Sequence, residues 1–415
     1  MPKIFSMSDT NFSTTDPYGL VSAEMFTHPH GIYHMLRYME PVHWSDVLNA
    51  WVITRYDDVL ACFKNPNLSN ALRRGSGTSQ LPQHLQKKMK PIDEHLSQWV
   101  LNLDGQEHHR LRVLLSKGFT PKVFDAMEPR IREIANHLID QVEHKGEMEF
   151  IRDFARPLPV AVIAEIFGIP ESDLPLLGNW AKDISNFFAI GPAKEWVLDK
   201  MVSSVAEFTE YLRDVVKANR ANPKDNLLGH LIRAEEKGDV LNESQLLANC
   251  VMLLFAGHDS TVNLIGSGML LLLQNPAQMQ LLKQRPSLVR SAVQEFLRLE
   301  SPVMRHDRVA AEDFALAGAQ IKKGQRVILI LGAANRDPTH FRDPDGLNIA
   351  RQESRHLTYG NGPHACLGYA LANKQAELGL GLVLERLPHI RQAATPHRWR
   401  EHFNFRGLKS LPVVF

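Results

Sequence analysis

The sequence lacks the features that mark several classes of protein. Only three cysteines occur in 415 residues, Cys62, Cys250 and Cys366, and none belongs to a CxxC pair. Neither a disulfide framework nor a cysteine-rich zinc site is therefore expected, and the expected location is cytoplasmic. The formal net charge is only +1 and no arginine-rich block occurs, so nothing indicates nucleic-acid binding.

Targeting and membrane segments are also missing. The first ten residues have neither the basic start nor the apolar run of a signal peptide. The only long apolar stretch, at about 250–273, is interrupted by a polar cluster within 257–263. A lipid-spanning helix rarely carries such a cluster at its centre, so we expect a buried helix and no membrane attachment. A GxGxxG motif and a βαβ rhythm are absent too, so a Rossmann domain is not indicated.

What is present is a mainly helical pattern with short strands. Hydrophobic residues make up 44% of the chain, enough for an extensive core. Alternating residues at 41–44 and 51–56 predict a β-hairpin, and the polar stretch at 65–102 predicts a long surface loop. Helical periodicity dominates 106–299, and strand patterns return at 308–310, 325–330 and 411–415.

The longest predicted helix spans 242–274. Asn242 is the expected N-cap, and Gln245 three residues later completes a capping box. The helix is apolar nearly all round, so it should cross the interior. A second helix is expected over 287–299.

The most informative segment is the run Tyr-Gly-Asn-Gly-Pro-His-Ala-Cys-Leu-Gly at 359–368. It places Cys366 just before a helix, where free amides and the helix dipole stabilise a thiolate. The glycines allow a flat cofactor to approach closely. Such a thiolate could be a nucleophile, a zinc ligand or an axial haem ligand. His364 is the only nearby base or further zinc ligand, and a structural cysteine in a glycine-rich turn remains an alternative.

Residues 359–372 resemble the haem-binding signature of the cytochrome P-450 family, Phe-Gly-x-Gly-x-His-x-Cys-x-Gly, followed by a helix with Leu-Ala. Four further segments agree in the expected order, so the resemblance covers nearly the whole chain. They are similar to the propionate helix (108–112), the oxygen-binding segment (256–261), the Glu-x-x-Arg motif (295–298) and the segment before the cysteine loop (341–351). Two departures occur: Tyr359 replaces the usual Phe, and Ser260 replaces the usual Thr.

The resemblance implies the cytochrome P-450 fold, mainly α with small β-sheets. It implies one domain over 1–415, β-rich at about 40–60 and 300–415 and helix-rich at about 106–299. Haem b would lie between the two parts with the Cys366 thiolate as its iron ligand, and this ligand favours O–O cleavage. The other implied cofactor contacts are His108, Arg112, Ala256, Arg308, Tyr359, Gly360, His364 and Gly368.

Two supporting groups of residues have roles implied by the resemblance. Glu295 and Arg298, which alone would be read as a surface ion pair, would form a buried network with Arg351 that braces the cysteine loop. Asp259 and Ser260 would lie beside the open side of the iron, where Asp259 delivers protons and Ser260 holds water. Thr261 is the weaker candidate for the alcohol, and an ordinary buried helix with a polar kink is the alternative.

The expected reaction is insertion of one atom of O2 into a lipophilic small molecule, by hydroxylation or epoxidation. Polyketide tailoring in secondary metabolism is the preferred setting. Asn404 is the possible polar anchor of a mainly apolar substrate pocket. The residues expected to line that pocket are Leu101, Phe187, Phe188, Met252, Phe255, Ala256, Val303, Met304, Asn404 and Phe405.

A separate ferredoxin and its reductase are the expected electron donors to a monomeric enzyme. Lys117, Lys122 and Lys374 are the candidate docking patch, with ordinary surface lysines as the alternative. Two other functions stay open, a peroxide-dependent fatty-acid hydroxylase and a haem-binding sensor without turnover. The acid–alcohol pair argues against the first, and product formation with a reductase and O2 would exclude the second.

Overall fold

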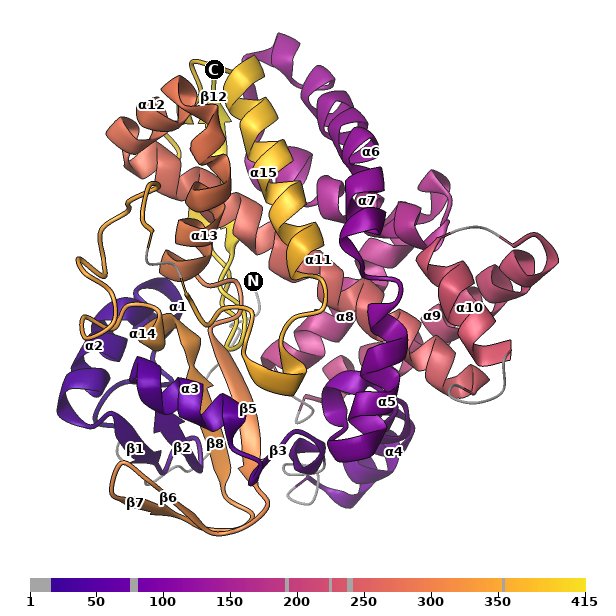
Figure 1. Cartoon of the computed structure of the whole chain (residues 1–415), viewed down its shortest axis with the longest axis vertical. Coiled ribbons are helices and arrows are strands. Elements are labelled where there is room, and N and C mark those ends of the chain that lie inside the picture. Colours follow the sequence, from indigo (N-terminus) through magenta and orange to yellow (C-terminus); the bar gives the residue numbers. More distant parts are fainter. Residues whose placement is uncertain (1–15, 75–80, 191–193, 224–225, 237–241, 353–354) are drawn as a thin grey trace.

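The computed structural model describes residues 16–74, 81–190, 194–223, 226–236, 242–352 and 355–415. The largest sheet lies to one side of the molecule, and most of the helices lie to the other (Figure 1). The predicted fold class, mainly α with small β-sheets, is confirmed. Across these described ranges, no helix combines the length and the apolar character that crossing a bilayer requires.

The helices account for most of the ordered chain. They are α1 (Ala23–Thr27), α2 (Pro29–Met39), α3 (Tyr56–Lys64), α4 (Gln83–Ser97), α5 (Gly105–Ser116), α6 (Pro121–Asp140), α7 (Pro157–Phe167), α8 (Leu174–Ile190), α9 (Glu195–Ala221), α10 (Leu227–Glu236), α11 (Glu243–Gln274), α12 (Pro276–Gln284), α13 (Val289–Leu299), α14 (Leu331–Ala334) and α15 (Tyr369–Arg386).

The largest sheet has the strand order β1-β2-β8-β5-β3. The predicted hairpin is confirmed, because β1 (Val42–Ser45) and β2 (Ala50–Ile53) pair antiparallel with Val42 opposite Ile53. β2 then pairs parallel with β8 (Arg326–Ile330), and β8 pairs antiparallel with β5 (Arg305–Ala310), which in turn pairs with β3 (Leu68–Ser69). The sheet thus joins the beginning of the chain to the segment after the Glu-x-x-Arg motif.

Three smaller sheets complete the β structure. β6 (Phe314–Leu316) pairs with β7 (Ala319–Ile321), and β10 (Arg398–Trp399) pairs with β11 (Leu408–Ser410). β12 (Pro412–Val414) lies between β4 (Glu147–Glu149) and β9 (Arg391–Gln392). The predicted terminal strand is therefore present as β12, and it pairs with β4, which is far away in the sequence.

The central helix α11 has the predicted start and course. The Asn242 side chain accepts from the Gln245 amide at 2.8 Å, and the Gln245 side chain accepts from the Asn242 amide at 3.4 Å, which completes the capping box. Most of its side chains are buried, and it packs against α7, α8, α9, α13 and α15. A helix with this all-round burial must cross the core, and Figure 1 shows it running beside α15.

The prediction of a long surface loop over 65–102 was wrong for much of that segment. Its second half contains α4, whose buried side chains Leu85, Met89, Ile92 and Leu96 recur every three or four residues. That spacing is a helical period, and it outweighs both the polar composition and Pro91 inside the helix. The helical spacing of the apolar residues therefore predicts this segment better than its overall polar composition does.

Candidate functional site

The cysteine loop is shaped by two glycines and by backbone hydrogen bonds. Gly360 has φ +70° and Gly362 has φ +73°, which is the left-handed region that favours glycine. A Cβ on Gly362 would also lie 3.0 Å from the carbonyl oxygen of Phe63. The Cys366 amide donates to the Tyr359 carbonyl at 2.7 Å, so the loop closes immediately before α15.

The Cys366 thiol has the backbone amide donors that the sequence predicts, but its net pKa is raised rather than lowered. The backbone amides of Gly368 and Tyr369 donate to its sulfur, and the Arg112 guanidinium is close enough to interact. Burial raises the pKa of the thiol, and these three groups offset only part of that rise. The side chain is nevertheless accessible to solvent. A thiol that is surrounded by protein and still accessible faces an internal hollow.

A second accessible surface lies in the middle of α11. Ala256 is exposed and Ser260 is partly exposed, although the helix around them is buried. The two residues are four apart and therefore share a helix face, and the Ser260 hydroxyl donates to the Ala256 carbonyl at 3.0 Å. Thr261 is buried and donates to the Gly257 carbonyl at 3.1 Å. We interpret Ala256 and Cys366 as opposite walls of one hollow.

Basic side chains gather near the cysteine loop. The rings of His108 and His364 lie 3.9 Å apart, and Arg112 donates to the Ala365 carbonyl. Burial is the main reason that the pKa of His108 falls to about 4, and His364 and Arg112 lower it further. The pKa of Arg308 is lowered to about 10, again chiefly by burial and then by Arg73.

Asp104 is the carboxylate that balances part of this charge. His364 Nε2 lies 3.6 Å from its Oδ1, and the Ser69 hydroxyl donates to Oδ2 at 2.5 Å. Mutual repulsion among the cations indicates a place for further negative charge. The two propionates of haem b would supply it, and the accessible thiol would supply the iron ligand, so the residues fit this cofactor.

Arg73 is a member of this group that sequence reasoning missed. Its Nη2 donates to Asn102 Oδ1 at 2.7 Å, and it interacts electrostatically with Arg308. Burial lowers the pKa of its guanidinium. Arg73 lies in the segment interpreted as a surface loop, and no family motif covers it, so the sequence offered no signal for it.

The predicted network around Glu295 is present as a set of buried contacts. Arg298 Nε and Nη2 donate to the two Glu295 carboxylate oxygens at 2.7 and 2.8 Å, and Arg351 Nε donates at 3.0 Å. All three residues are less than a tenth exposed. Arg298 Nη1 also donates to the Asn335 carbonyl at 3.0 Å, and the Asn335 side chain accepts from the Leu357 amide at 2.7 Å, close to the cysteine loop.

The Tyr359 hydroxyl points toward Asn373. It donates to the Asn373 Oδ1 at 2.6 Å, between the cysteine loop and α15. Burial, and then the neighbouring Cys366, raise the pKa of Tyr359 well above its usual value, so the hydroxyl stays protonated. This departure from the usual Phe therefore adds a hydrogen bond to α15.

The sequence places both Asp259 and Ser260 beside the open side of the iron, whereas the structure gives the two side chains different partners. Asp259 is 3% exposed, and its Oδ2 accepts from the Ser185 hydroxyl at 2.7 Å and from Arg400 Nη1 at 3.1 Å. Successive helix residues are about 100° apart, which turns the acid toward α8 while Ser260 faces the hollow. Burial alone would raise the pKa of Asp259, but Arg400, His258 and Ser185 outweigh it and keep the carboxyl ionised.

Aromatic rings from three segments form one cluster near Ala256. Phe188 stacks on Phe255 at 5.6 Å, and Phe255 lies 6.5 Å from Phe405. Phe187 packs beside Phe188 at 5.4 Å and is buried, as is Met252, whereas Leu101 is 36% exposed. Trp99, 6.1 Å from Phe255, is a member that the sequence reasoning missed.

Two of the residues predicted to contact substrate, Met304 and Asn404, have other partners in the fold. Met304 is buried with Tyr33 and Ile328 in a separate core beneath α2, while Val303 bridges to Phe405. Adjacent residues of an extended segment face opposite sides, so only one of the pair can face the cluster. The Asn404 side chain accepts from Arg305 at 2.7 Å and donates to the Phe188 carbonyl at 3.1 Å, so it already has partners in the protein.

Comparison with known proteins shows the family to which the chain belongs. The family model described as Cytochrome P450 matches residues 83–399. Cytochrome P450 CYP107DY1 of Priestia megaterium is 39% identical over 378 residues, covering 88% of this chain and 90% of the relative. The polyketide biosynthesis cytochrome P450 PksS of Bacillus subtilis is 35% identical and covers 94% and 98%. The crystal structure of P450BioI with an acyl carrier protein carrying hexadec-9Z-enoic acid has a TM-score of 0.87 at 35% identity, covering 95% of this chain and 100% of that one.

Proposed function

Because this chain belongs to the cytochrome P450 family, we propose that it hydroxylates or epoxidises a lipophilic small molecule of secondary metabolism, such as a polyketide. Members of the family are monooxygenases that use haem b, a cysteine thiolate ligand and O2. The observation that carries the substrate proposal is the cluster of Phe188, Phe255 and Phe405 beside Ala256. An apolar, aromatic wall favours an apolar ligand.

Haem b supplies the redox chemistry that splits O2 and transfers one of its atoms to the substrate. In the proposed arrangement the Cys366 sulfur would bind the iron. His108, Arg112, Arg308 and His364 would hold the propionates. The network of Glu295, Arg298 and Arg351 would brace the loop from behind, as positioning residues that touch neither substrate nor cofactor.

Ser260 and Asp259 have separate proposed tasks. The Ser260 hydroxyl would orient a water molecule in the hollow, because it lies on the accessible face of α11 and, while its hydrogen is donated to the Ala256 carbonyl, its oxygen can still accept from water. Asp259 would supply protons from the other side of the helix, after releasing its hydrogen bonds to Ser185 and Arg400. Thr261 remains the weaker candidate because it is buried.

A ferredoxin and its reductase remain the proposed electron donors to a monomeric, cytoplasmic enzyme. The lysine patch proposed for docking is weaker than the sequence indicated. Lys374 forms ion pairs with Asp125 at 2.9 Å and Glu128 at 3.1 Å, so its charge is already compensated. Lys117 is exposed, and the Lys122 side chain lies outside the described residues.

The substrate proposal is tested by a spectral screen of the purified ferric enzyme. Polyketides, terpenoids, steroids, peptides and fatty acyl compounds are added, and the shift of the Soret band is recorded. Hits are then incubated with ferredoxin, reductase and O2, and the products are identified. The proposal requires a hydroxylated or epoxidised product of an apolar ligand. If only charged, hydrophilic compounds shift the band, the proposed substrate class is wrong.

A further inference from the structure

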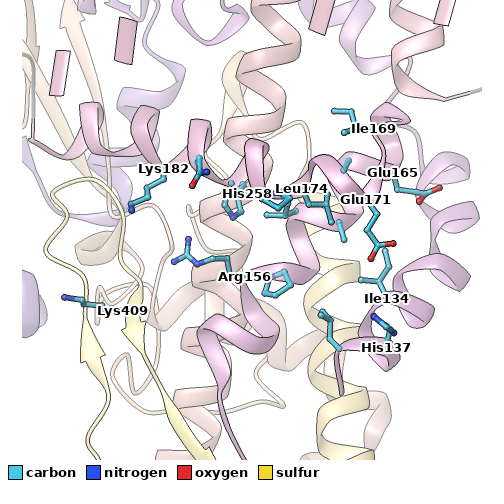
Figure 2. Close-up of a pocket in the computed structure, with 18 of the residues that line it drawn as sticks. Ile134, His137, Arg156, Glu165, Ile169, Glu171, Leu174, Lys182, His258 and Lys409 are labelled. Atoms are coloured by element: carbon cyan, nitrogen blue, oxygen red, sulfur yellow. The ribbon is translucent and has the colours of Figure 1, made fainter. Parts of the chain in front are cut away.

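A large cleft lies apart from the proposed haem site. It opens between α6, α7, α8 and the β10–β11 hairpin and has a volume of about 1950 Å³. None of the residues proposed to hold haem lines it. Pockets for drug-sized molecules usually measure about 300–1,000 Å³, so the cleft can hold such a molecule and water beside it. Figure 2 shows side chains from several elements pointing into this space.

One end of the cleft carries cationic side chains that form no ion pair with a described residue, although Asp259 interacts electrostatically with Arg156. Arg156 follows the short π-helix Ile151–Ala155, Lys182 lies on α8 and Lys409 on β11, and Figure 2 shows all three on the side of the cleft away from Glu165 and Glu171. In the part of the chain that the structure describes, none of them is within ion-pair distance of a carboxylate. The arginine beside them, Arg400, is already paired with Asp259 at 3.1 Å.

Most acidic residues of the cleft lie away from these cations and are largely neutralised; the exception is Glu401, which is exposed between β10 and β11. Arg130 pairs with Glu133 at 2.8 Å and with Glu165 at 3.2 Å, and Arg386 pairs with Asp140 at 2.7 Å. Glu165 and Glu171 lie at the opposite end from Lys182 and Lys409 (Figure 2). Charge is therefore distributed unevenly along the cleft, and the more positive end lies toward the β10–β11 hairpin.

His258 gives an independent sign that a polar partner is missing. Its ring lines the inner wall of the cleft and is 2% exposed, and neither ring nitrogen has a hydrogen-bond partner among the described residues. Buried polar atoms are nearly always paired, so such an orphan needs an explanation. Burial lowers the pKa of this ring to about 4, which leaves it neutral near pH 7, with one N–H free to donate.

The wall between the two ends is apolar. Small and medium side chains from three helices line it: Ile134 and Leu138 from α6, Val160, Ala161 and Ala164 from α7, and Leu174 from α8. An alkyl chain laid along this wall would remove apolar surface from water at about 25 cal/mol per Å². The cleft thus combines an apolar track with a cationic terminus.

We propose that this cleft binds a small amphiphilic anion, an alkyl chain with a single carboxylate head. The head lies among Arg156, Lys182 and Lys409, and the chain follows the apolar wall of α6 and α7. Charge complementarity selects the anion, because Lys182, Lys409 and Arg156 form no ion pair with a carboxylate of the described residues. None of the residues proposed to hold haem lines this site, so an anion can bind here while another ligand occupies the haem site.

The test is equilibrium dialysis of radiolabelled dodecanoate against the ferric holoenzyme. Saturating 4-phenylimidazole occupies the haem hollow during the measurement. We expect one bound dodecanoate per chain, and at least tenfold weaker binding of dodecan-1-ol, which has the same chain without the charge. The variant Arg156→Gln/Lys182→Gln should bind dodecanoate at least tenfold more weakly. The control Lys87→Gln/Lys323→Gln removes the same charge from exposed positions elsewhere and should bind like the parent.

Folding of each variant is checked by its reduced carbon monoxide spectrum and its unfolding midpoint. If the double variant does not fold, Lys409→Gln replaces it, because Lys409 is exposed and its loss should still weaken binding about threefold. Equal affinity for dodecanoate and dodecan-1-ol would overturn the proposal. So would unchanged binding in the cleft variants, or no binding up to the solubility limit of the probe.

Discussion

Arg400 Nη1 donates to the Asp259 carboxylate across 3.1 Å and thereby ties the segment after β10 to the middle of α11. Ser185 donates to the same carboxylate oxygen from α8. The acid proposed to deliver protons is therefore held by a cation and a hydroxyl on the side of the helix away from Ser260. Its proton transfer has to begin with release from these partners.

Replacing Asp259 by Asn should slow turnover by roughly 10²-fold, because a positioned acid or base contributes about that much. Replacing Arg400 by Gln should raise the pKa of the Asp259 carboxyl, since its main counter-charge is lost. When the pH is lowered, turnover of the variant should therefore begin to change at a higher pH than turnover of the parent. Arg398→Gln, in the same hairpin, is the matched control. Identical pH profiles for the parent and Arg400→Gln would contradict the role given to this pair.

Ser260→Ala should lower coupling, measured as product formed per reducing equivalent consumed. The hydroxyl is on the accessible face of α11, and its loss leaves water in the hollow without an oriented acceptor. Ser260→Thr should retain or improve coupling, because a β-branched side chain is more restricted. Thr261→Ala should have little effect on coupling, since Thr261 is buried. If only Thr261→Ala lowered coupling, the hydroxyl that orients water would be that of Thr261 and not that of Ser260.

Glu295→Gln should destabilise the protein by about 3–5 kcal/mol, because it leaves two buried guanidinium groups without their carboxylate. Denaturant unfolding of the ferric holoenzyme measures this loss. Haem retention should fall as well, since Arg298 also contacts the Asn335 carbonyl behind the cysteine loop. Glu300→Gln is a useful comparison, because Glu300 pairs with Arg336 and Arg406 away from that loop. It should cost stability while haem retention stays near the parent level.

His402 predicts a fall in stability with acid. Its Nδ1 accepts from the amides of Asn404 and Phe405, each at 3.1 Å, and burial, then Arg400, lowers its pKa to about 4. A histidine whose pKa is lower in the folded state than in the unfolded one binds fewer protons when folded. Stability is therefore unaffected well above pH 6.5 and falls as the pH drops from about 6.5 toward 4.

At pH 5 this single group should cost about 2 kcal/mol relative to pH 7. Unfolding by denaturant at the two pH values should show His402→Gln losing less stability than the parent. His28→Gln, at an exposed position, should behave like the parent. An equal loss in His402→Gln and the parent would mean that His402 is not the group that titrates.

Much of the site followed from sequence because its motifs are local. The glycines and Cys366 lie within ten residues, and Glu295 and Arg298 are one helix turn apart, so pattern and geometry coincide. The fold class followed from periodicity in the same way. Asp259 was misplaced because the partners that orient it, Ser185 and Arg400, are distant in sequence and belong to no motif.

The substrate side was harder to predict for a physical reason. Met304 and Val303 have the same apolar character, and only strand geometry decides which of them faces the aromatic cluster. Asn404 looked like a free polar anchor because its partners Arg305 and Phe188 become neighbours only in the folded chain. The α4 helix was missed because its polar surface residues obscured a four-residue buried face.

The central claim is that Cys366 is the iron ligand, and the carbon monoxide spectrum of the reduced protein tests it most directly. The parent protein, loaded with haem b, should absorb at the long wavelength typical of thiolate ligation. Cys366→His and Cys366→Ala should lose that band, whereas Cys62→Ala and Cys250→Ala should keep it, because both of those thiols are buried in the core. If Cys366→Ala retained the thiolate band, the ligand assigned here would be wrong.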